Sequence, residues 1–301
     1  MSESVTVRVP AKVNVQLAVG AARPDGFHDL ANVFLAVGLY DEVTVTPADG
    51  LRVTCSGPDA AQVPLDASNL AARAAIALAG RYGIAPDVHI HIAKDIPVAG
   101  GMAGGSADGA GALLACDALW STGATREELL ALCAELGSDV PFSLVGGAAL
   151  GVGRGEQLTP VEVGGTFHWV FAVAEGGLST PAVYREFDRL TEGTHVPEPV
   201  VSAPLLDALR TGDTGALAAA LSNDLQAPAL SLRPSLEHTL AAGTVAGARA
   251  ALVSGSGPTT AFLTEDEASA RALADALTAS GTCRTARVAA SPAQGATLQR
   301  P

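Results

Sequence analysis

The sequence predicts an α+β protein built from two domains, and three observations lead to that prediction. The first fifty residues carry the alternation of apolar and polar residues that is typical of half-buried strands. Segments with helical periodicity follow, but helices and strands do not alternate with the regularity of βαβ units. With 301 residues, of which 48% are hydrophobic, the chain is long and apolar enough for a core in each of two domains.

Local signals predict the elements of the first half of the chain. Alternation predicts strands near residues 5–9, 43–45 and 88–92, and a Pro-Asp-Gly turn falls within residues 22–28. Helices are expected where apolar residues recur at helical spacing between start and stop residues. The expected helices are 68–82, which Gly83 ends, 106–120, and 129–136, which a Thr125–Glu128 capping box opens and Gly137 ends.

A glycine-rich segment at residues 146–155 is expected to carry the boundary between the domains. This gives an ATP-binding and catalytic domain at 1–155, a substrate-binding domain at 156–290, and a disordered tail at 291–301. The signals in the second half predict a strand at 167–174, a polar proline-rich stretch at 191–204, a helix at 213–221, a strand–turn–strand at 250–263, and a helix at 265–277 with Thr264 and Glu267 as its capping box.

Composition argues against several classes of function. The chain has 18 Lys and Arg against 31 Asp and Glu, a net charge of −13, so no nucleic-acid partner is expected. No apolar run reaches the ~18–20 residues of a membrane span, so no membrane partner is expected. The first residues lack the features of a secretion signal, and the four cysteines show no CxxC spacing. These features favour a reduced, cytoplasmic protein.

The strongest chemical signal is a glycine-rich loop that leads into a predicted helix. Residues 97–106 read PVAGGMAGGS, and four of the six residues from Gly100 to Gly105 are glycine. Glycine lets backbone approach a ligand, and a helix start offers free N–H groups and a partial positive charge. We therefore predict a phosphate-binding loop with Ser106 at the helix N-cap. The alternative is a tight connection that binds nothing, and the loop matches neither the Walker A nor the GxGxxG pattern.

A polar triplet on a predicted strand is the second signal. Lys12, Asn14 and Gln16 share one strand face, because side chains alternate along a strand. An ordinary exposed face would look the same. Lys12 is nevertheless one of only two lysines, and a lysine can place a compact charge beside a phosphate or a carboxylate.

Two further segments have both a structural and a functional interpretation. Asp139 follows a predicted helix and precedes Pro141, so it is either the N-cap of the next segment or a general base on a rigid turn. The Ser-Gly-Ser-Gly sequence at residues 254–257 is either a hairpin turn or a second backbone clamp beside the first glycine loop.

Three of these motifs, in this order, resemble those of the GHMP kinase superfamily. They are Pro-Ala-Lys-x-Asn at residues 10–14, the loop at 97–106, and the sequence at 254–257. Shorter segments resemble one branch of it, whose members phosphorylate a cytidine-diphospho sugar alcohol in the non-mevalonate route to isoprenoids: RPDGFHDL at 23–30, LGSDVP at 136–141, GLSTP at 177–181 and ND at 223–224. The resemblance covers about residues 5–290. It implies a ribosomal-protein-S5-like N-terminal domain, a ferredoxin-like C-terminal domain and a site between them.

The resemblance also implies roles for individual residues. The phosphates of ATP would lie on the glycine loop, Mg²⁺ would balance their charge, and no residue is assigned as a direct metal ligand. Asp139 would take the proton of the acceptor hydroxyl, the 2-hydroxyl of the sugar alcohol, with Lys12 as its partner. The implied nucleotide-binding residues are Pro97, Val98, Ala99, Gly100, Gly101, Met102, Ala103, Gly104, Gly105, Ser106 and, beside the first helix, Asn69.

Aromatic residues suggest where the cytosine of such a substrate would bind. Phe27, His28 and Phe34 lie within eight residues in a chain with only 4% aromatic residues, and Tyr184 would supply a second wall. Stacking is worth ~1–3 kcal/mol per base. Phe34 could instead be a core residue. The full implied set is Asn14, Phe27, His28, Phe34, Thr180, Tyr184 and Gly255. The chain departs from the family in having Phe27 where tyrosine is usual and Met102-Ala103 where Leu-Gly is common.

Two other functions remain open on the sequence alone. One is another small-molecule kinase of the superfamily, of the homoserine or mevalonate type, although those substrates have no base to stack on aromatic residues. The other is a non-catalytic nucleotide-binding sensor, which would not need a base such as Asp139. The expected partner is a small-molecule substrate, and the expected assembly is a monomer or a weak homodimer.

Overall fold

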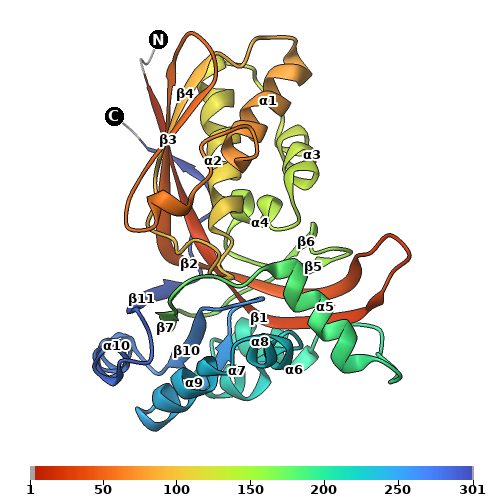
Figure 1. Ribbon diagram of the computed structural model, residues 1–301, viewed down its shortest axis with the longest axis vertical. Coiled ribbons are helices and arrows are strands. Elements are labelled where there is room, and N and C mark those ends of the chain that lie inside the picture. Colours follow the sequence, from red (N-terminus) through yellow and green to blue (C-terminus); the bar gives the residue numbers. More distant parts are fainter. Residues whose placement is uncertain (1–3, 300–301) are drawn as a thin grey trace.

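The structure is a computed structural model that describes residues 4–299, and it has the expected α+β architecture. Within these residues an eight-stranded mixed sheet runs from the top of the molecule in Figure 1 down to a curved hairpin at its right side, and a four-stranded antiparallel sheet lies in the lower half. The same residues contain no helix that is long and apolar enough to cross a membrane.

A long curved hairpin organises the larger sheet. Its strands, β1 (Val5–Ala22) and β2 (His28–Pro47), run from the top of the molecule to its side (Figure 1). The main strand order is β12-β1-β2-β4-β3, with β5 and β6 attached to β2 and β8 attached to β1. The other strands are β3 (Arg52–Ser56), β4 (Val88–Ala93), β5 (Ala148–Val152), β6 (Gln157–Pro160), β8 (Ser222–Asn223) and β12 (Thr297–Leu298).

Four helices pack on one side of this sheet (Figure 1). They are α1 (Leu70–Tyr82), α2 (Gly104–Trp120), α3 (Arg126–Leu136) and α4 (Val140–Val145), preceded by the short helix η1 (Ala60–Gln62). The predicted boundary signals are confirmed, because α1 ends at Gly83 in the left-handed region and Thr125 forms a full capping box with Glu128. Buried alanines let α1 and α2 pack closely against each other.

The smaller sheet has the order β11-β7-β10-β9. Alternate side chains of β7 enter different cores: Trp169 and Phe171 join the large core shared with the first half, whereas Val170 packs with Leu273 of α10. This alternation joins the two halves of the molecule. The remaining elements are β7 (Phe167–Val173), β9 (Ala250–Val253), β10 (Thr260–Thr264), β11 (Thr285–Ser291), α5 (Thr180–Thr191), α6 (Ala203–Thr211), α7 (Thr214–Ala220), α8 (Gln226–Leu232), α9 (Ser235–Val245) and α10 (Glu267–Ser280).

Two boundaries differ from the sequence prediction. The larger sheet extends past residue 155, because β6 pairs with β5. The expected disordered tail is wrong for residues 291–299, since this segment crosses back to the larger sheet, where β12 pairs with β1. Its order comes from backbone partners distant in the sequence, which composition does not reveal.

Smaller differences have local causes. The glycine-rich segment 146–155 contains β5, and the start of α6 lies inside the proline-rich stretch, where Pro204 occupies an early helical position that tolerates proline. The N-cap of α10 is Asp266 and not Thr264, because the Asp266 carboxylate accepts the hydrogen bond of Ser269 N.

Candidate active site

Most of the predicted site residues converge on one cavity of about 590 Å³. Its walls are the β1–β2 hairpin, the loop before α2, the start of α4, the start of α5, and the loop between β9 and β10. The predicted residues that line it are Lys12, Asn14, Phe27, His28, Ala99, Gly100, Gly101, Ala103, Gly104, Gly105, Ser106, Asp139, Thr180, Tyr184 and Gly255.

The cavity brings Lys12 and Asp139 together. Lys12 Nζ lies 3.8 Å from Asp139 Oδ2, although the two residues are far apart in the sequence. Asp139 occupies the N-cap position of α4, yet its side chain makes no capping hydrogen bond there. The carboxylate is therefore free for the cavity, and its side chain is 32% exposed.

Hydrogen bonds fix the position of the Lys12 ammonium. It donates to Asn14 Oδ1 and, over 3.0 Å, to the carbonyl oxygen of Gly101, while Asn14 Nδ2 donates to Asn32 Oδ1 over 2.7 Å. Burial lowers the pKa of Lys12 below its ordinary value, and the nearby Asp139 carboxylate opposes that shift. The ammonium thus joins the glycine loop to the carboxylate across the cavity.

The glycine loop has the conformation of a tight entry into α2. Ala99, Gly101 and Ala103 all have positive φ, at 51°, 74° and 61°. The helix consequently begins at Gly104 with Ala103 as N-cap, so the prediction of Ser106 at the N-cap is wrong by three positions. Gly104, Gly105 and Ser106 line the cavity. Their N–H groups belong to the first turn of α2, where backbone N–H groups have no carbonyl partner within the helix.

The Ser-Gly-Ser-Gly segment packs directly against this loop. A Cβ on Gly101 would collide with the carbonyl oxygen of Ser254, and Ser254 Oγ donates to the Gly101 carbonyl over 3.1 Å. Gly255 has φ +55°, and a Cβ there would lie 3.1 Å from Lys12 Nζ. The interpretation of this segment as a second backbone clamp agrees with these contacts. Asn223 Nδ2 holds the clamp by donating to the carbonyls of Val253 and Gly255.

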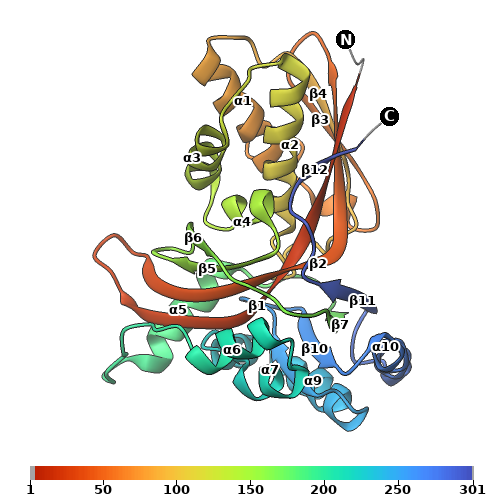
Figure 2. The same cartoon turned by 180° about the vertical axis from the view of Figure 1, so that it is seen from behind.

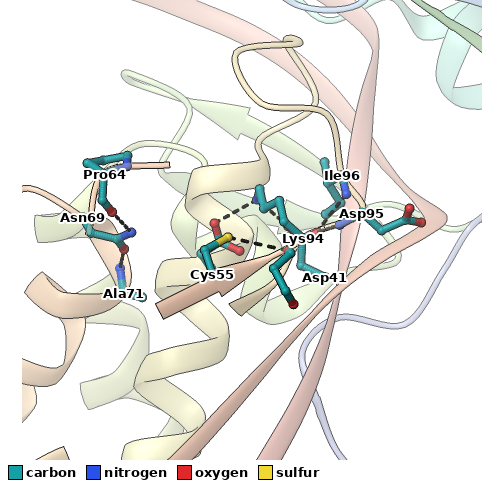
Figure 3. Close-up of polar contacts among 10 residues, drawn as sticks. Asp41, Cys55, Pro64, Asn69, Ala71, Lys94, Asp95 and Ile96 are labelled. Carbon is teal, nitrogen blue, oxygen red and sulfur yellow. Dashed lines mark hydrogen bonds and ion pairs between the residues drawn. The ribbon is translucent and has the colours of Figure 1, made fainter. Parts of the chain in front are cut away.

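A buried charge cluster supports the loop from below. Lys94 Nζ contacts Asp41 and lies 2.8 Å from Asp108 Oδ2 on α2, while Asp41 Oδ1 accepts the N–H groups of Asp95 and Ile96 (Figure 3). Burial, with repulsion from Asp41, raises the pKa of Asp108 to about 7 against the opposing effect of Lys94. The cluster ties the larger sheet, the start of the loop and α2 together.

Aromatic residues line the other end of the cavity. The ring centroids of His28 and Tyr184 lie 5.0 Å apart, and His28 Nε2 is 2.9 Å from Asp188 Oδ1. Phe27 is 48% exposed, with the Arg154 guanidinium 5.1 Å from the centroid of its ring. This end can therefore offer flat apolar surfaces together with polar groups at their edges.

Some predicted residues lie elsewhere. Phe34 is fully buried, and its ring centroid lies 4.8 Å from that of Phe142, on which it stacks. It is therefore a core residue and does not line the cavity. Met102 is also buried in the core, and Pro97 and Val98 do not line the cavity. Asn69 caps α1, accepting from Ala71 N and donating to the Pro64 carbonyl (Figure 3).

The cavity also contains residues that the sequence reasoning missed. The polar and charged ones are Asn32, Ser138, Arg154, Arg185, Asp188 and Ser256. Ser138 and Ser256 fall inside motifs already marked, so attention to their neighbours could have found them. Arg154, Arg185 and Asp188 carry no local signal, because only the fold brings them to the cavity.

Comparison with known proteins agrees with this arrangement. The GHMP kinases N terminal domain matches residues 69–147, and the GHMP kinases C terminal domain matches residues 205–283. The chain belongs to the GHMP kinase family. As a GHMP kinase it is an enzyme that transfers a phosphoryl group from ATP. The resemblance of the three motifs to this family is thereby confirmed.

Relatives of high identity share one name. The 4-diphosphocytidyl-2-C-methyl-D-erythritol kinase of Streptomyces avermitilis is 81% identical over 295 residues, which cover 98% of this chain and 99% of the relative. The enzyme of the same name from Thermobifida fusca is 60% identical over 303 residues, with 98% of each chain covered.

Solved structures agree on the fold of this GHMP kinase. A crystal structure of 4-(cytidine 5'-diphospho)-2C-methyl-D-erythritol kinase matches with a TM-score of 0.76 and 34% identity, over 95% of this chain and 99% of that one. Homoserine kinase from Cytophaga hutchinsonii matches with a TM-score of 0.77 but only 19% identity, over 99% and 98% of the two chains. The second likeness shows the fold alone.

Proposed function

We propose that this GHMP kinase phosphorylates the 2-hydroxyl of 4-diphosphocytidyl-2-C-methyl-D-erythritol, with Asp139 as general base and Lys12 as its partner. The observation that carries the proposal is the arrangement of one cavity. A carboxylate and an ammonium 3.8 Å apart face a glycine loop at a helix start, and aromatic residues line the opposite end. The names of the relatives with 81% and 60% identity support the same substrate.

The glycine loop, Lys12 and Asp139 form one end of the cavity, which we call the phosphate end. It provides the groups that phosphoryl transfer requires. Such transfer depends mainly on positioning and on stabilising charge. The β- and γ-phosphates of ATP would lie against the N–H groups of Gly104, Gly105 and Ser106, where the helix dipole favours negative charge. Lys12 brings a buried positive charge to the same loop through the Gly101 carbonyl.

Proton transfer from the acceptor is assigned to Asp139. As the hydroxyl oxygen of the substrate bonds to the γ-phosphorus and the bond from phosphorus to the β,γ-bridging oxygen breaks, the hydroxyl proton passes to Asp139 Oδ2, and ADP leaves. A positioned base contributes typically ~10²–10⁴-fold to such a step. The Lys12 ammonium, 3.8 Å from Asp139 Oδ2, places a positive charge beside the carboxylate that would accept the proton.

The side chains at the phosphate end are compatible with Mg²⁺ that binds together with ATP. No group of three His, Cys, Asp or Glu side chains in residues 4–299 is arranged to hold a metal by itself. Mg²⁺ commonly uses one or two protein oxygens together with phosphates and water, and the Ser106 hydroxyl at the start of α2 is a suitable oxygen donor here. When bound, the ion would neutralise the charge of the phosphates.

The aromatic end would bind the cytidine portion. The base would stack against Phe27 or Tyr184, and His28, held by Asp188, would hydrogen-bond an edge of the base. Phe27 provides the stacking face without the hydroxyl of a tyrosine. Homoserine and mevalonate contain no aromatic base, so this end of the cavity favours the cytidine substrate over homoserine and mevalonate.

We expect the enzyme to act in the cytoplasm, as a monomer or a weak homodimer.

A coupled ADP-release assay tests the substrate. The purified chain is given Mg-ATP with the cytidine-diphospho sugar alcohol, with homoserine, or with mevalonate. We expect ADP release with the first acceptor alone. Turnover of homoserine or mevalonate would contradict the proposed substrate, and ATP binding without turnover of any acceptor would favour the sensor.

A further inference from the structure

The C-terminal segment, residues 292–299, forms a strap between the two halves of the molecule. It leaves β11 in the smaller sheet and passes alongside α4 to β12 at the edge of the larger sheet, as the dark-blue segment of Figure 2 shows. At its far end Val7 pairs with Leu298, and Gln299 N donates to the Thr6 carbonyl over 2.8 Å. We call residues 292–299 the C-terminal strap.

The middle of the strap is hydrogen-bonded to α4 and to the segment just after it. Ala296 N donates to the Ser143 carbonyl over 3.1 Å, and Gly147 N donates to the Ala293 carbonyl over 2.7 Å. Gly146 and Gln294 form a β-bridge. The strap therefore binds the last turn of α4 along its backbone.

Close packing accompanies these hydrogen bonds. A Cβ on Gly295 would collide with the carbonyl oxygen of Leu144, and a Cβ on Gly146 would collide with the backbone of Gly295. Ala293 packs against the buried cluster of Phe34, Ala36, Phe142 and Ala149, of which Phe142 belongs to α4. The strap and α4 are therefore in direct backbone contact, with no room for a side chain at Gly295.

Helix α4 carries the proposed base at its other end. Asp139 is the N-cap, and both the N–H and the hydroxyl of Ser143 donate to its carbonyl oxygen, over 3.1 and 3.2 Å. The carbonyl of the same Ser143 accepts from the strap. One residue thus connects the strap to the backbone of Asp139 across a helix of six residues.

We propose that the C-terminal strap is a positioning segment, which holds α4 so that the Asp139 carboxylate faces Lys12 and the acceptor hydroxyl. The proposal rests on the proposed role of Asp139 as base. A misplacement of ~1 Å in a reacting group can cost ~10²-fold in rate. Because the strap does not line the cavity, its loss should change the transfer step and leave the ATP loop in place.

Two truncations separate positioning from general stabilisation. Removal of residues 297–301 takes away β12 but keeps the contacts with α4, whereas removal of 293–301 takes away both. We expect the longer truncation to lower kcat about tenfold or more while KM for ATP changes less than about twofold, and the shorter one to keep kcat within about twofold. Equal kcat values for the two truncations, in chains shown to be folded by circular dichroism, would overturn the proposal.

A point variant covers the case in which the longer truncation does not fold. Gly295→Ala pushes the strap away from α4 and should lower kcat in the same way, while Gly80→Ala, where a Cβ meets nothing within 4 Å, serves as the matched control. Unchanged kcat in a folded Gly295→Ala variant would contradict the proposal.

The Asp139→Asn background distinguishes failure of the strap proposal from failure of the proposed base. If the strap acts through Asp139, Gly295→Ala should lower kcat in the wild-type chain and have less than about twofold effect on the residual rate of Asp139→Asn. An equal loss in both backgrounds would overturn the positioning role. If Asp139→Asn itself loses no activity, the proposed base fails, whatever the strap variants do.

Discussion

The two ends of the cavity differ in how firmly their side chains are held. At the phosphate end, Lys12 is 5% exposed and has two hydrogen-bond partners, and the loop above it packs against a second backbone segment. At the aromatic end, Phe27 is 48% exposed, and the Arg154 guanidinium lies 5.1 Å from the centroid of its ring.

This difference matches the two tasks that we assign. Phosphoryl transfer requires groups fixed within a fraction of an ångström, so a buried and hydrogen-bonded frame suits it. Recognition of a base requires an open flat surface that the substrate itself covers on binding. Variants at the phosphate end should therefore lower kcat, and variants at the aromatic end should raise KM for the acceptor.

The largest effect is expected from Asp139→Asn. The amide keeps the shape of the side chain but cannot accept the proton, so kcat should fall ~10²–10⁴-fold. Steady-state ADP release measures this loss. Asp207→Asn, an exposed carboxylate on α6 outside the cavity, is the control and should keep kcat within about twofold. A fall in kcat of less than tenfold for Asp139→Asn would show that Asp139 is not the general base.

The next largest effect is expected from a variant at the aromatic end of the cavity. Phe27→Ala removes an exposed aromatic face, and the loss of stacking worth ~1–3 kcal/mol corresponds to a rise of about 5–150-fold in KM for the acceptor. KM for ATP and kcat should stay within about threefold. A variant that instead lowers kcat strongly would break the separation between the two ends.

Arg154→Ala is expected to have a smaller effect at the same end. The guanidinium lies over the Phe27 ring, and an exposed cation–π contact is worth ~0.5–1 kcal/mol, or about two- to fivefold in KM for the acceptor. Arg154→Lys keeps the charge and should recover part of the loss. Identical KM values for wild type and Arg154→Ala would show that this arginine does not support the Phe27 ring.

The buried cluster of Asp41, Lys94 and Asp108 beneath the loop should affect the stability of the fold and not the rate of phosphoryl transfer. Burial, with repulsion from Asp41, raises the pKa of Asp108 from 3.8 to about 7 against the effect of Lys94. Between these values the folded protein holds a proton that the unfolded chain has lost, so stability falls as pH rises from about 4 to about 7.

In Asp108→Asn this fall should disappear. Thermal unfolding at pH 4.5 and pH 7.5 would measure it, and wild type should lose several degrees more of Tm between the two values than the variant. Equal pH dependence of Tm in the two proteins would show that Asp108 does not titrate as the geometry indicates.

The parts that were predictable from the sequence depend on neighbours in the chain. The Thr125–Glu128 capping box, the stop at Gly83 and the glycine loop are local patterns, and the structure contains all three. The meeting of Lys12 with Asp139 followed from family motifs and not from spacing.

The parts that were not predictable depend on distant contacts. Arg154 lines the cavity because Leu30 N donates to the Gly153 carbonyl and holds that turn against β2. Phe34 is in the core because Phe142 of α4 stacks on it. Residues 293–296 are ordered because their backbone partners lie near residues 36 and 143–147.

One binding measurement tests the separation of the two ends most directly. The dissociation constant of 4-diphosphocytidyl-2-C-methyl-D-erythritol would be measured by calorimetry without ATP, for wild type, Asp139→Asn and Phe27→Ala. We expect Asp139→Asn to bind the substrate within about threefold of wild type, and Phe27→Ala to bind it about 5–150-fold more weakly. Similar weakening in both variants, or weakening in Asp139→Asn alone, would contradict the separation of the two ends of the cavity.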